Sequence, residues 1–193
     1  MISGAGWKRC FHIRDEYVCS KLYCEQDAVQ LHPQLNVFED MMILATLCYV
    51  KRDGYTLMVY RNRKQNDIHE GKWNGLGGKF EAGETPEECV VREVYEESGL
   101  SIHNPKLCGL LMFPNFMGND WYVFVFTATD FKGELIESPE GKLEWIPDEK
   151  LLGLNLWESD HIFMPWIEEG KFFSAKFDYE GDKLRGYNVV FHS

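Results

Sequence analysis

The sequence is short of positive charge. Its 193 residues include 20 Lys and Arg against 31 Asp and Glu, for a formal net charge of −11. A nucleic-acid polymer or an anionic membrane surface needs a dense basic footprint, so this composition argues against both as the main partner. A small phosphorylated ligand is still compatible with an acidic chain, because a bound metal ion reverses the local field.

Long hydrophobic runs are also lacking. The apolar stretch over residues 41–50 is too short to span a bilayer. The N-terminus does not show the charged, apolar and small-residue pattern of a secretory signal. We therefore expect a soluble, cytoplasmic protein without a membrane partner. The sequence is compatible with both a monomer and a homodimer.

The six cysteines form no CxxC pair, and several lie in apolar runs where a reduced thiol packs as a small hydrophobic side chain. A zinc site built from Cys10, His12, Cys19 and Cys24 is badly spaced and is not favoured. No disulfide framework is expected.

The segment 78–100 is the richest in pattern, because acids, one arginine and glycines recur there at fixed spacing. A helix is expected over Pro86–Ser98, since Thr85 suits the N-cap and Glu88 completes a capping box. Gly99 suits the position just beyond the helix end.

Three carboxylates of this expected helix fall on one face. Glu93, Glu96 and Glu97 occupy positions i, i+3 and i+4. Such crowded charges repel one another unless a divalent cation lies among them. Hard oxygen ligands suit Mg²⁺ or Mn²⁺, and an ion of this kind binds the phosphates of a substrate.

The apolar side chains of the same helix fall on another arc: Val90, Val91, Val94 and Tyr95. They are expected to pack on a sheet and to leave the acidic arc facing solvent. Arg92 is expected to bridge to a carboxylate of the segment such as Glu84. The preceding glycine-rich stretch Trp73–Lys79 lets the backbone, at Gly78 among others, approach a ligand or metal closely.

The segment resembles the signature of the Nudix hydrolase family at every position: Gly78, Glu84, Arg92, Glu93, Val94, Glu96, Glu97, Gly99 and Leu100. An ordinary solvated acidic helix does not require the glycines, the arginine and this spacing together. The resemblance implies metal binding by Glu93, Glu96 and Glu97, and cleavage of a nucleoside diphosphate linked to another group. It covers residues 42–191.

Strands are expected at residues 42–50, 55–60, 106–113, 121–128, 143–146, 173–179 and 183–191. The first two, the third and fourth, and the last two are expected to pair antiparallel. Residues 130–141 are expected to form a loop, 147–152 a helical turn, and 157–169 a helix that Pro165 kinks or interrupts. The result is an α+β fold. By resemblance it is an α/β/α sandwich with a mixed central sheet and the acidic helix packed on it.

Residues 42–193 are thus interpreted as one Nudix hydrolase domain. Residues 1–41 carry no motif and are interpreted as an N-terminal extension that packs peripherally.

The chemistry that the resemblance implies is in-line attack by water on phosphorus, which needs a carboxylate to accept the proton. Glu97 is one candidate, and Arg92 belongs to the same catalytic segment. Glu140 resembles the extra glutamate that related enzymes supply from a loop, and the alternative is an ordinary loop carboxylate. A basic cluster before the glycine-rich stretch either meets the phosphates or stays a solvated loop: Arg61, Arg63 and Lys64.

Two stretches resemble the branch that hydrolyses 8-oxo-dGTP and other oxidised purine nucleoside triphosphates, namely 71–79 and 156–160. The resemblance implies that Asn74 and Asp160 hydrogen-bond the purine edge. Trp157 either forms an aromatic wall for the base or is simply core. The remaining substrate-binding candidates are Ser159 and Lys79. That branch often has two adjacent aspartates where this chain has Ser-Asp, so the preferred base stays open.

Three alternatives remain beside a nucleoside triphosphate diphosphatase. ADP-ribose hydrolysis is the first, because that branch has a proline downstream of the signature and Pro114 lies in that region. A catalytically silent nucleotide sensor is the second, and the intact glutamates speak against it. An isopentenyl-diphosphate isomerase is the third, and its Cys and His metal ligands have no evident counterpart.

Overall fold

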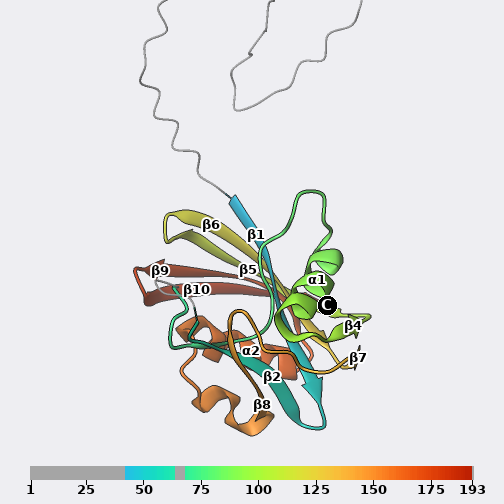
Figure 1. Ribbon diagram of the computed structural model, residues 1–193. Coiled ribbons are helices and arrows are strands. Elements are labelled where there is room, and N and C mark those ends of the chain that lie inside the picture. Colours follow the sequence, from blue (N-terminus) through green and yellow to red (C-terminus); the bar gives the residue numbers. More distant parts are fainter. Residues whose placement is uncertain (1–41, 64–67, 193) are drawn as a thin grey trace, which may run out of the picture. The chain divides into compact units, whose positions relative to one another are not determined.

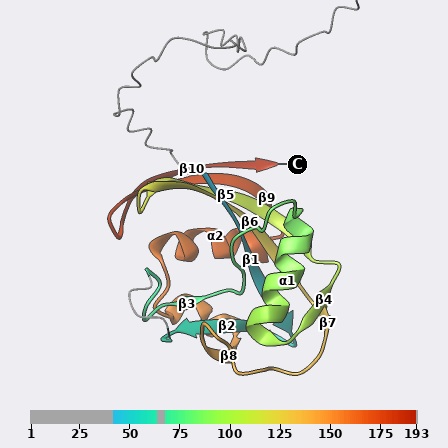
Figure 2. The ribbon, with the colours of Figure 1, turned by 45° about the horizontal axis from the view of Figure 1, so that its top comes forward.

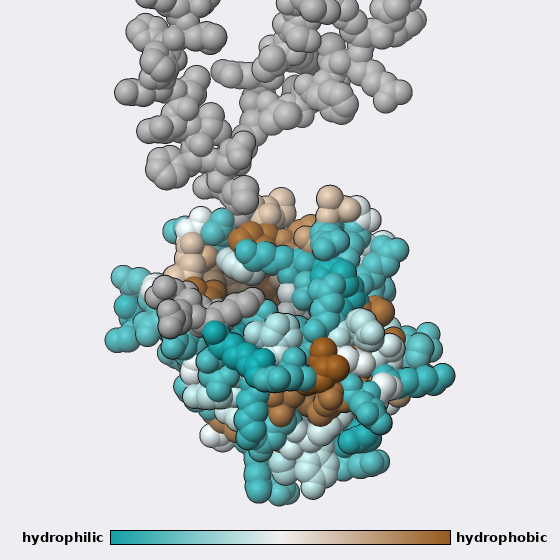
Figure 3. Space-filling model, in the orientation of Figure 1, coloured by the Kyte–Doolittle hydropathy of each residue, from teal (hydrophilic) through white to brown (hydrophobic). Residues whose placement is uncertain are grey.

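The computed structural model describes residues 42–63 and 68–192 (Figure 1). The expectations for residues 1–41, including the zinc alternative, lie outside the described residues, and so does Lys64. Among the described residues no helix is long and apolar enough to cross a membrane. Hydrophilic side chains cover most of the face seen in Figure 3.

The described residues form an eight-stranded mixed sheet in the order β10-β9-β5-β6-β1-β2-β3, with β8 paired to β2. The strands are β1 Met42–Arg52, β2 Tyr55–Arg61, β3 Trp73–Asn74, β5 Lys106–Phe116, β6 Asn119–Ala128, β8 Gly141–Pro147, β9 Phe172–Glu180 and β10 Lys183–His192. Strand β1 runs parallel to β6, and β5 runs parallel to β9. The other pairs are antiparallel, so all three expected antiparallel pairs are confirmed.

A second, two-stranded sheet joins β4 Ser101–His103 to β7 Asp130–Lys132. The expectation of a loop over 130–141 was therefore wrong for its last residue, which begins β8, and for its first three residues. These three residues pair with the strand that directly follows the acidic helix, and local sequence does not reveal such a long-range contact.

Two helices cover opposite faces of the sheet, as two separate core clusters show. Val50 of β1 packs with Val90 and Val94 of α1 Pro86–Ser98. The neighbouring Tyr49 packs with Phe163 of α2 Glu158–Glu168. Successive strand residues point to opposite faces, so this alternation confirms the α/β/α sandwich, and Figure 2 shows α1 beside β1.

Helix α1 begins and ends as expected. Thr85 is the N-cap of a capping box with Glu88, and Gly99 stands beyond the helix end with a φ of 78°. The predicted apolar arc was too wide, because Val91 is 36% exposed and Tyr95 is 57% exposed. The buried stripe follows the i, i+4, i+7 spacing of Val90, Val94 and Glu97.

That stripe also overturns the expectation that the acidic arc faces solvent. Glu97 is 5% exposed because it continues the line of Val90 and Val94 at the C-terminal end of the helix. The exposed position belongs to Glu96, one residue earlier in the chain. The acids of α1 are thus divided between the interior and the surface.

Helix α2 continues through Pro165, so the expected interruption was wrong. Proline removes one backbone donor from the helix. Burial of Phe163 and Met164 against the sheet offsets that loss. The expected helical turn is present as a 3-10 helix, Asp148–Gly153.

Candidate active site

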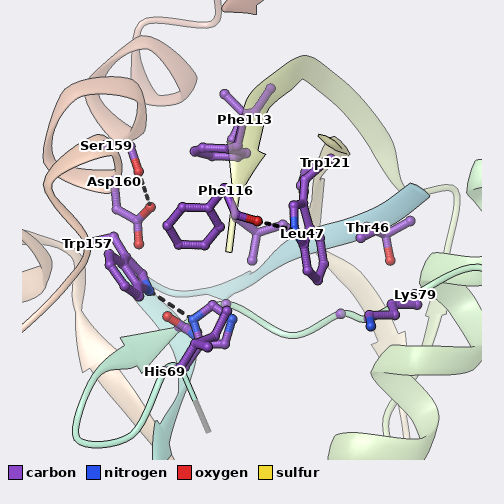
Figure 4. A pocket seen from close by; sticks show the side chains of 18 of the residues that line it. Thr46, Leu47, His69, Lys79, Phe113, Phe116, Trp121, Trp157, Ser159 and Asp160 are labelled. Atoms are coloured by element: carbon purple, nitrogen blue, oxygen red, sulfur yellow. Dashed lines mark hydrogen bonds between the residues drawn. The ribbon is translucent and has the colours of Figure 1, made fainter. Parts of the chain in front are cut away.

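An open cavity of about 620 Å³ is lined by residues of both helices, of the glycine-rich stretch and of several strands (Figure 4). Figure 4 shows Trp157 and Asp160 on one side and Thr46 and Lys79 on the other. The acidic lining residues are Glu93, Glu97, Glu140 and Asp160. The aromatic lining residues are Phe113, Phe116, Trp121, Trp157 and Tyr179.

The glycine-rich stretch forms one edge of the cavity by pairing with β1. The Thr46 N–H donates to the Gly78 carbonyl at 2.8 Å, and the Cys48 N–H donates to the Leu76 carbonyl at 2.6 Å. A Cβ atom at Gly77 would stand 2.2 Å from the Thr46 carbonyl oxygen, and the φ of Gly77 is 144°. The glycines are therefore required first for close approach to a neighbouring strand. The close approach of this backbone to a ligand stays a prediction, and it applies to the side of the stretch that faces the cavity.

Glu97 is the most buried acid of α1. Its carboxylate accepts the Gly77 N–H at 2.9 Å and lies 3.8 Å from the Arg61 guanidinium. Burial raises the pKa of Glu97 to about 8; the Gly77 hydrogen bond opposes this rise, and the nearby Glu140 charge adds to it. A cation beside the Glu97 carboxylate would therefore stabilise its ionised form.

Arg92 ties the helix to the turn before it. Its guanidinium forms a two-bond contact with Glu84, at 2.6 and 2.9 Å, so the expected bridge is confirmed. It also donates to Glu93 at 2.8 Å and to Glu96 at 3.2 Å. The hydrogen bond from Arg92 is the main reason that the pKa of Glu84 is lowered to about 2. Neither Arg92 nor Glu96 lines the cavity.

The basic cluster divides between the cavity and a loop. Arg61 lines the cavity, and its guanidinium lies 2.7 Å from the Glu140 carboxylate. Arg63 does not line this cavity; it donates to the Ser138 carbonyl at 2.7 Å and also contacts Glu137. Arg63 thereby holds the loop that carries Glu140 rather than facing the cavity.

Asp160 is the acid of the α2 side. Burial raises the pKa of Asp160. Hydrogen bonds from Ser159 and the Trp157 backbone and the charge of Lys72 oppose this rise, and the net pKa is about 7. The Ser159 hydroxyl donates to Asp160 at 3.4 Å and accepts from Tyr179 at 3.0 Å. A carboxyl with this pKa accepts a hydrogen bond when ionised and donates one when protonated.

Trp157 is both core and cavity wall. Its side chain is 8% exposed, and its ring lies 5.5 Å from Phe116 in an edge arrangement. Its indole N–H donates to Nδ1 of His69 at 2.8 Å. The two alternatives posed for this residue are thus compatible. Asn74, the other residue predicted to hydrogen-bond the base edge, also lines the cavity.

Several lining residues carried no signal that singled them out in the sequence. Phe116 follows a break in strand register between 113 and 116, so simple alternation does not place it inward. Trp121 donates its indole N–H to the Phe116 carbonyl at 3.2 Å, and Lys79 lies 5.1 Å from its ring centre. Tyr179 and His69 were also missed, because an aromatic residue in a strand or a lone histidine is usually structural.

The carboxylates near α1 are hard oxygen donors, the kind of ligand that a divalent ion such as Mg²⁺ prefers. Among residues 42–63 and 68–192, no three Asp, Glu, His or Cys side chains converge into a ready-made site. Arg92 draws Glu93 aside, and the Gly77 N–H holds Glu97. Glu93 and Glu97 nevertheless both line the cavity, and Gly78 lies directly against the Glu93 carboxylate. Oxygen donors of this kind fit Mg²⁺ or Mn²⁺.

The sandwich fold and the acid-lined cavity are the arrangement that the sequence resemblance implied. Residues 41–167 match the NUDIX domain, and the chain belongs to the Nudix hydrolase family. Members of this family generally use divalent metal ions.

Three relatives illustrate the similarity. The oxidized purine nucleoside triphosphate hydrolase of Danio rerio is 34% identical over 140 residues, which is 72% of this chain and 87% of the relative. The Mus musculus protein of the same name is 32% identical over 129 residues, covering 65% and 82%. The crystal structure of a MutT protein from Bacillus halodurans has a TM-score of 0.68 at 34% identity, covering 76% and 97%.

Proposed function

We propose that this protein hydrolyses nucleoside triphosphates to a monophosphate and pyrophosphate, with oxidised purines such as 8-oxo-dGTP as preferred substrates. The observation that carries the proposal is that one cavity joins a group of carboxylates near α1 to an aromatic wall and an acid near α2. The names of the relatives from Danio rerio and Mus musculus support the choice of substrate.

In this proposal the α1 side of the cavity receives the phosphates. Glu93, Glu96 and Glu97, with the backbone at Gly78, hold Mg²⁺ or Mn²⁺. The ion, when bound, neutralises charge on the phosphate oxygens. Lys79 adds a positive charge at the same side.

A carboxylate accepts the proton of the attacking water, and Glu97 and Glu140 are the two candidates. Both line the cavity, and Arg61 contacts both. Arg92 acts at a distance, because it fixes the turn and the helix through Glu84.

The α2 side of the cavity receives the base. Asp160 and Asn74 hydrogen-bond its edge, and Trp157 supplies an aromatic wall against which the base stacks. Ser159 orients Asp160 through its hydroxyl group. The partner is thus a small-molecule nucleotide and neither a nucleic-acid polymer nor a membrane.

In the same proposal residues 42–193 carry out catalysis and residues 1–41 are an extension. The protein acts in the cytoplasm as a monomer or a homodimer. ADP-ribose hydrolysis gains no support from Pro114, which is exposed and does not line the cavity. The isomerase alternative needs Cys and His ligands, and in the described part of the chain no such cluster occurs.

One experiment tests the proposal. The protein is incubated with Mg²⁺ and a panel of canonical dNTPs, 8-oxo-dGTP, 2-oxo-dATP, ADP-ribose and dinucleoside polyphosphates, and the products are identified. Release of pyrophosphate and the monophosphate from 8-oxo-dGTP, at a higher kcat/KM than from dGTP, is the expected result. Preferred cleavage of ADP-ribose would contradict it. Binding of nucleotides without turnover would indicate a sensor.

A further inference from the structure

Lys72 lies in the stretch before β3, where that stretch contacts the turn that leads into α2. Its ammonium group donates to the Leu156 carbonyl at 3.1 Å and lies 4.6 Å from the ring centre of Trp157. Trp157 lines the cavity, whereas Lys72 does not. The cation therefore rests on the indole from outside the cavity.

The surrounding hydrogen bonds hold Lys72 in register with Trp157. The Trp73 N–H donates to the Asn155 carbonyl at 3.0 Å. The Asn155 side chain donates to the Gly71 carbonyl at 2.9 Å. The backbone on both sides of Lys72 is thus hydrogen-bonded to Asn155. These bonds help to keep the Lys72 side chain over the Trp157 ring.

Lys72 also acts on the charge of Asp160. The charge of Lys72 opposes burial, which disfavours the ionised carboxyl. The titratable groups that face Asp160 from other elements are Tyr49 of β1 and Tyr179 of β9, and the pKa of each is raised above its ordinary value. Both are neutral near pH 7, so they offer Asp160 no compensating charge. Ser159 contributes its hydroxyl from the same helix.

We propose that Lys72 is a specificity-determining residue of the base site that acts without touching the base: it holds the Trp157 wall and places its charge beside the helix turn that carries Asp160. An ionised Asp160 accepts hydrogen bonds and so selects base edges that present N–H donors, as guanine-type bases do. A cation on one face of the indole also stabilises the ring in one orientation. This inference rests on the proposed function, because that function assigns the base to this side of the cavity.

A titration tests the electrostatic half without any substrate. The ¹³C NMR signal of the Asp160 carboxyl, assigned with Asp160→Asn, is followed from pH 4 to pH 9 in the wild type, Lys72→Met and Lys72→Arg. The midpoint is expected to rise in Lys72→Met and to stay near the wild-type value in Lys72→Arg. An unchanged midpoint in Lys72→Met overturns the proposal. If that variant does not fold, Lys72→Gln replaces it in the same measurement.

Kinetics test the specificity half. In Lys72→Met the KM for 8-oxo-dGTP is expected to rise about tenfold while kcat changes little, on the scale of losing a partly buried cation–π contact. The KM for dCTP should change far less, and Lys72→Arg should restore the wild-type values. An equal change for both nucleotides, or an equal fall in kcat, would assign Lys72 a purely structural role. If the wild type cleaves no nucleotide, the proposed function fails, and the titration still decides how Lys72 acts on Asp160.

Discussion

Gly78 lies directly against the carboxylate of Glu93: a Cβ atom at Gly78 would stand 2.5 Å from both of its oxygens. Real Cβ atoms do not approach other atoms so closely. An alanine at position 78 would therefore push the Glu93 carboxylate, the end of a flexible side chain, out of its present place. The carboxylate keeps this position only while residue 78 has no side chain.

Replacing Gly78 with alanine tests this relationship. Gly78→Ala is expected to displace the Glu93 carboxylate and to lower kcat by about a hundredfold, on the scale seen when one charge-stabilising group is removed. Gly153→Ala is the matched control, since nothing lies within 4 Å of a Cβ there and its φ is not positive. Melting curves and kcat are measured for both. Wild-type kcat in Gly78→Ala would show that the Glu93 position is not needed.

Removing one carboxylate charge from α1 tests the metal assignment. Glu97→Gln and Glu96→Gln are each expected to keep the fold and to lose about a hundredfold or more in turnover. Glu87→Gln is the control, because Glu87 lies exposed in the first turn of the same helix. Turnover is measured over a series of Mg²⁺ concentrations. Near-normal activity of either variant at limiting Mg²⁺ would remove that residue from the metal site.

Truncating Asp160 tests base recognition. Asp160→Ala leaves a buried base edge without its partner, at a cost of about 1 to 3 kcal/mol. The kcat/KM for 8-oxo-dGTP should fall roughly ten- to a hundredfold, whereas that for dCTP and the metal dependence should change little. An equal fall for the two nucleotides would mean that Asp160 supports the fold instead of reading the base.

The raised pKa of Asp160 also predicts how stability depends on pH. Its pKa is about 7 in the folded protein against the ordinary 3.8, so the folded state holds the proton more tightly. The resulting stabilisation is fully present below pH 3.8 and is lost as the pH rises through 7. Asp160→Asn removes this dependence.

The measurement is the free energy of unfolding in urea for the wild type and Asp160→Asn. The free energy of unfolding of Asp160→Asn, minus that of the wild type, should increase from pH 5 to pH 7 and level off above pH 8. A difference that stays constant over this range would mean that Asp160 titrates normally.

Beginning the chain at Met42 tests the role of the extension. Strand β1 starts at Met42 and pairs with β6 from that residue onward, so the shortened chain keeps every described strand pair. It is expected to stay soluble and to retain most of its kcat/KM, because residues 1–41 carry no motif and the family match begins at residue 41. Aggregation or a large loss of kcat/KM would place the missing residues in the core or the site.

The sequence by itself determined the local structure of this protein and its family. Thr85, Glu88 and Gly99 mark the ends of α1 through contacts within a few residues, and such contacts depend little on the rest of the chain. The spacing of the glutamates within one helix and the alternation along the strands are local in the same sense. For this reason the helix, the hairpins and the family signature could all be predicted.

Only the tertiary structure decided which distant residues meet. His69 and Trp157 are 88 positions apart, and their hydrogen bond depends on how the chain packs α2 beside the stretch before β3. Glu97 is buried because the sheet lies under its stripe of α1, and Arg63 faces a loop because Ser138 lies within reach. The strands near these residues are themselves paired across long stretches of the chain, as β1 is with β6 and β2 is with β8. No local pattern encodes that pairing, because it is set by the packing of the whole sheet.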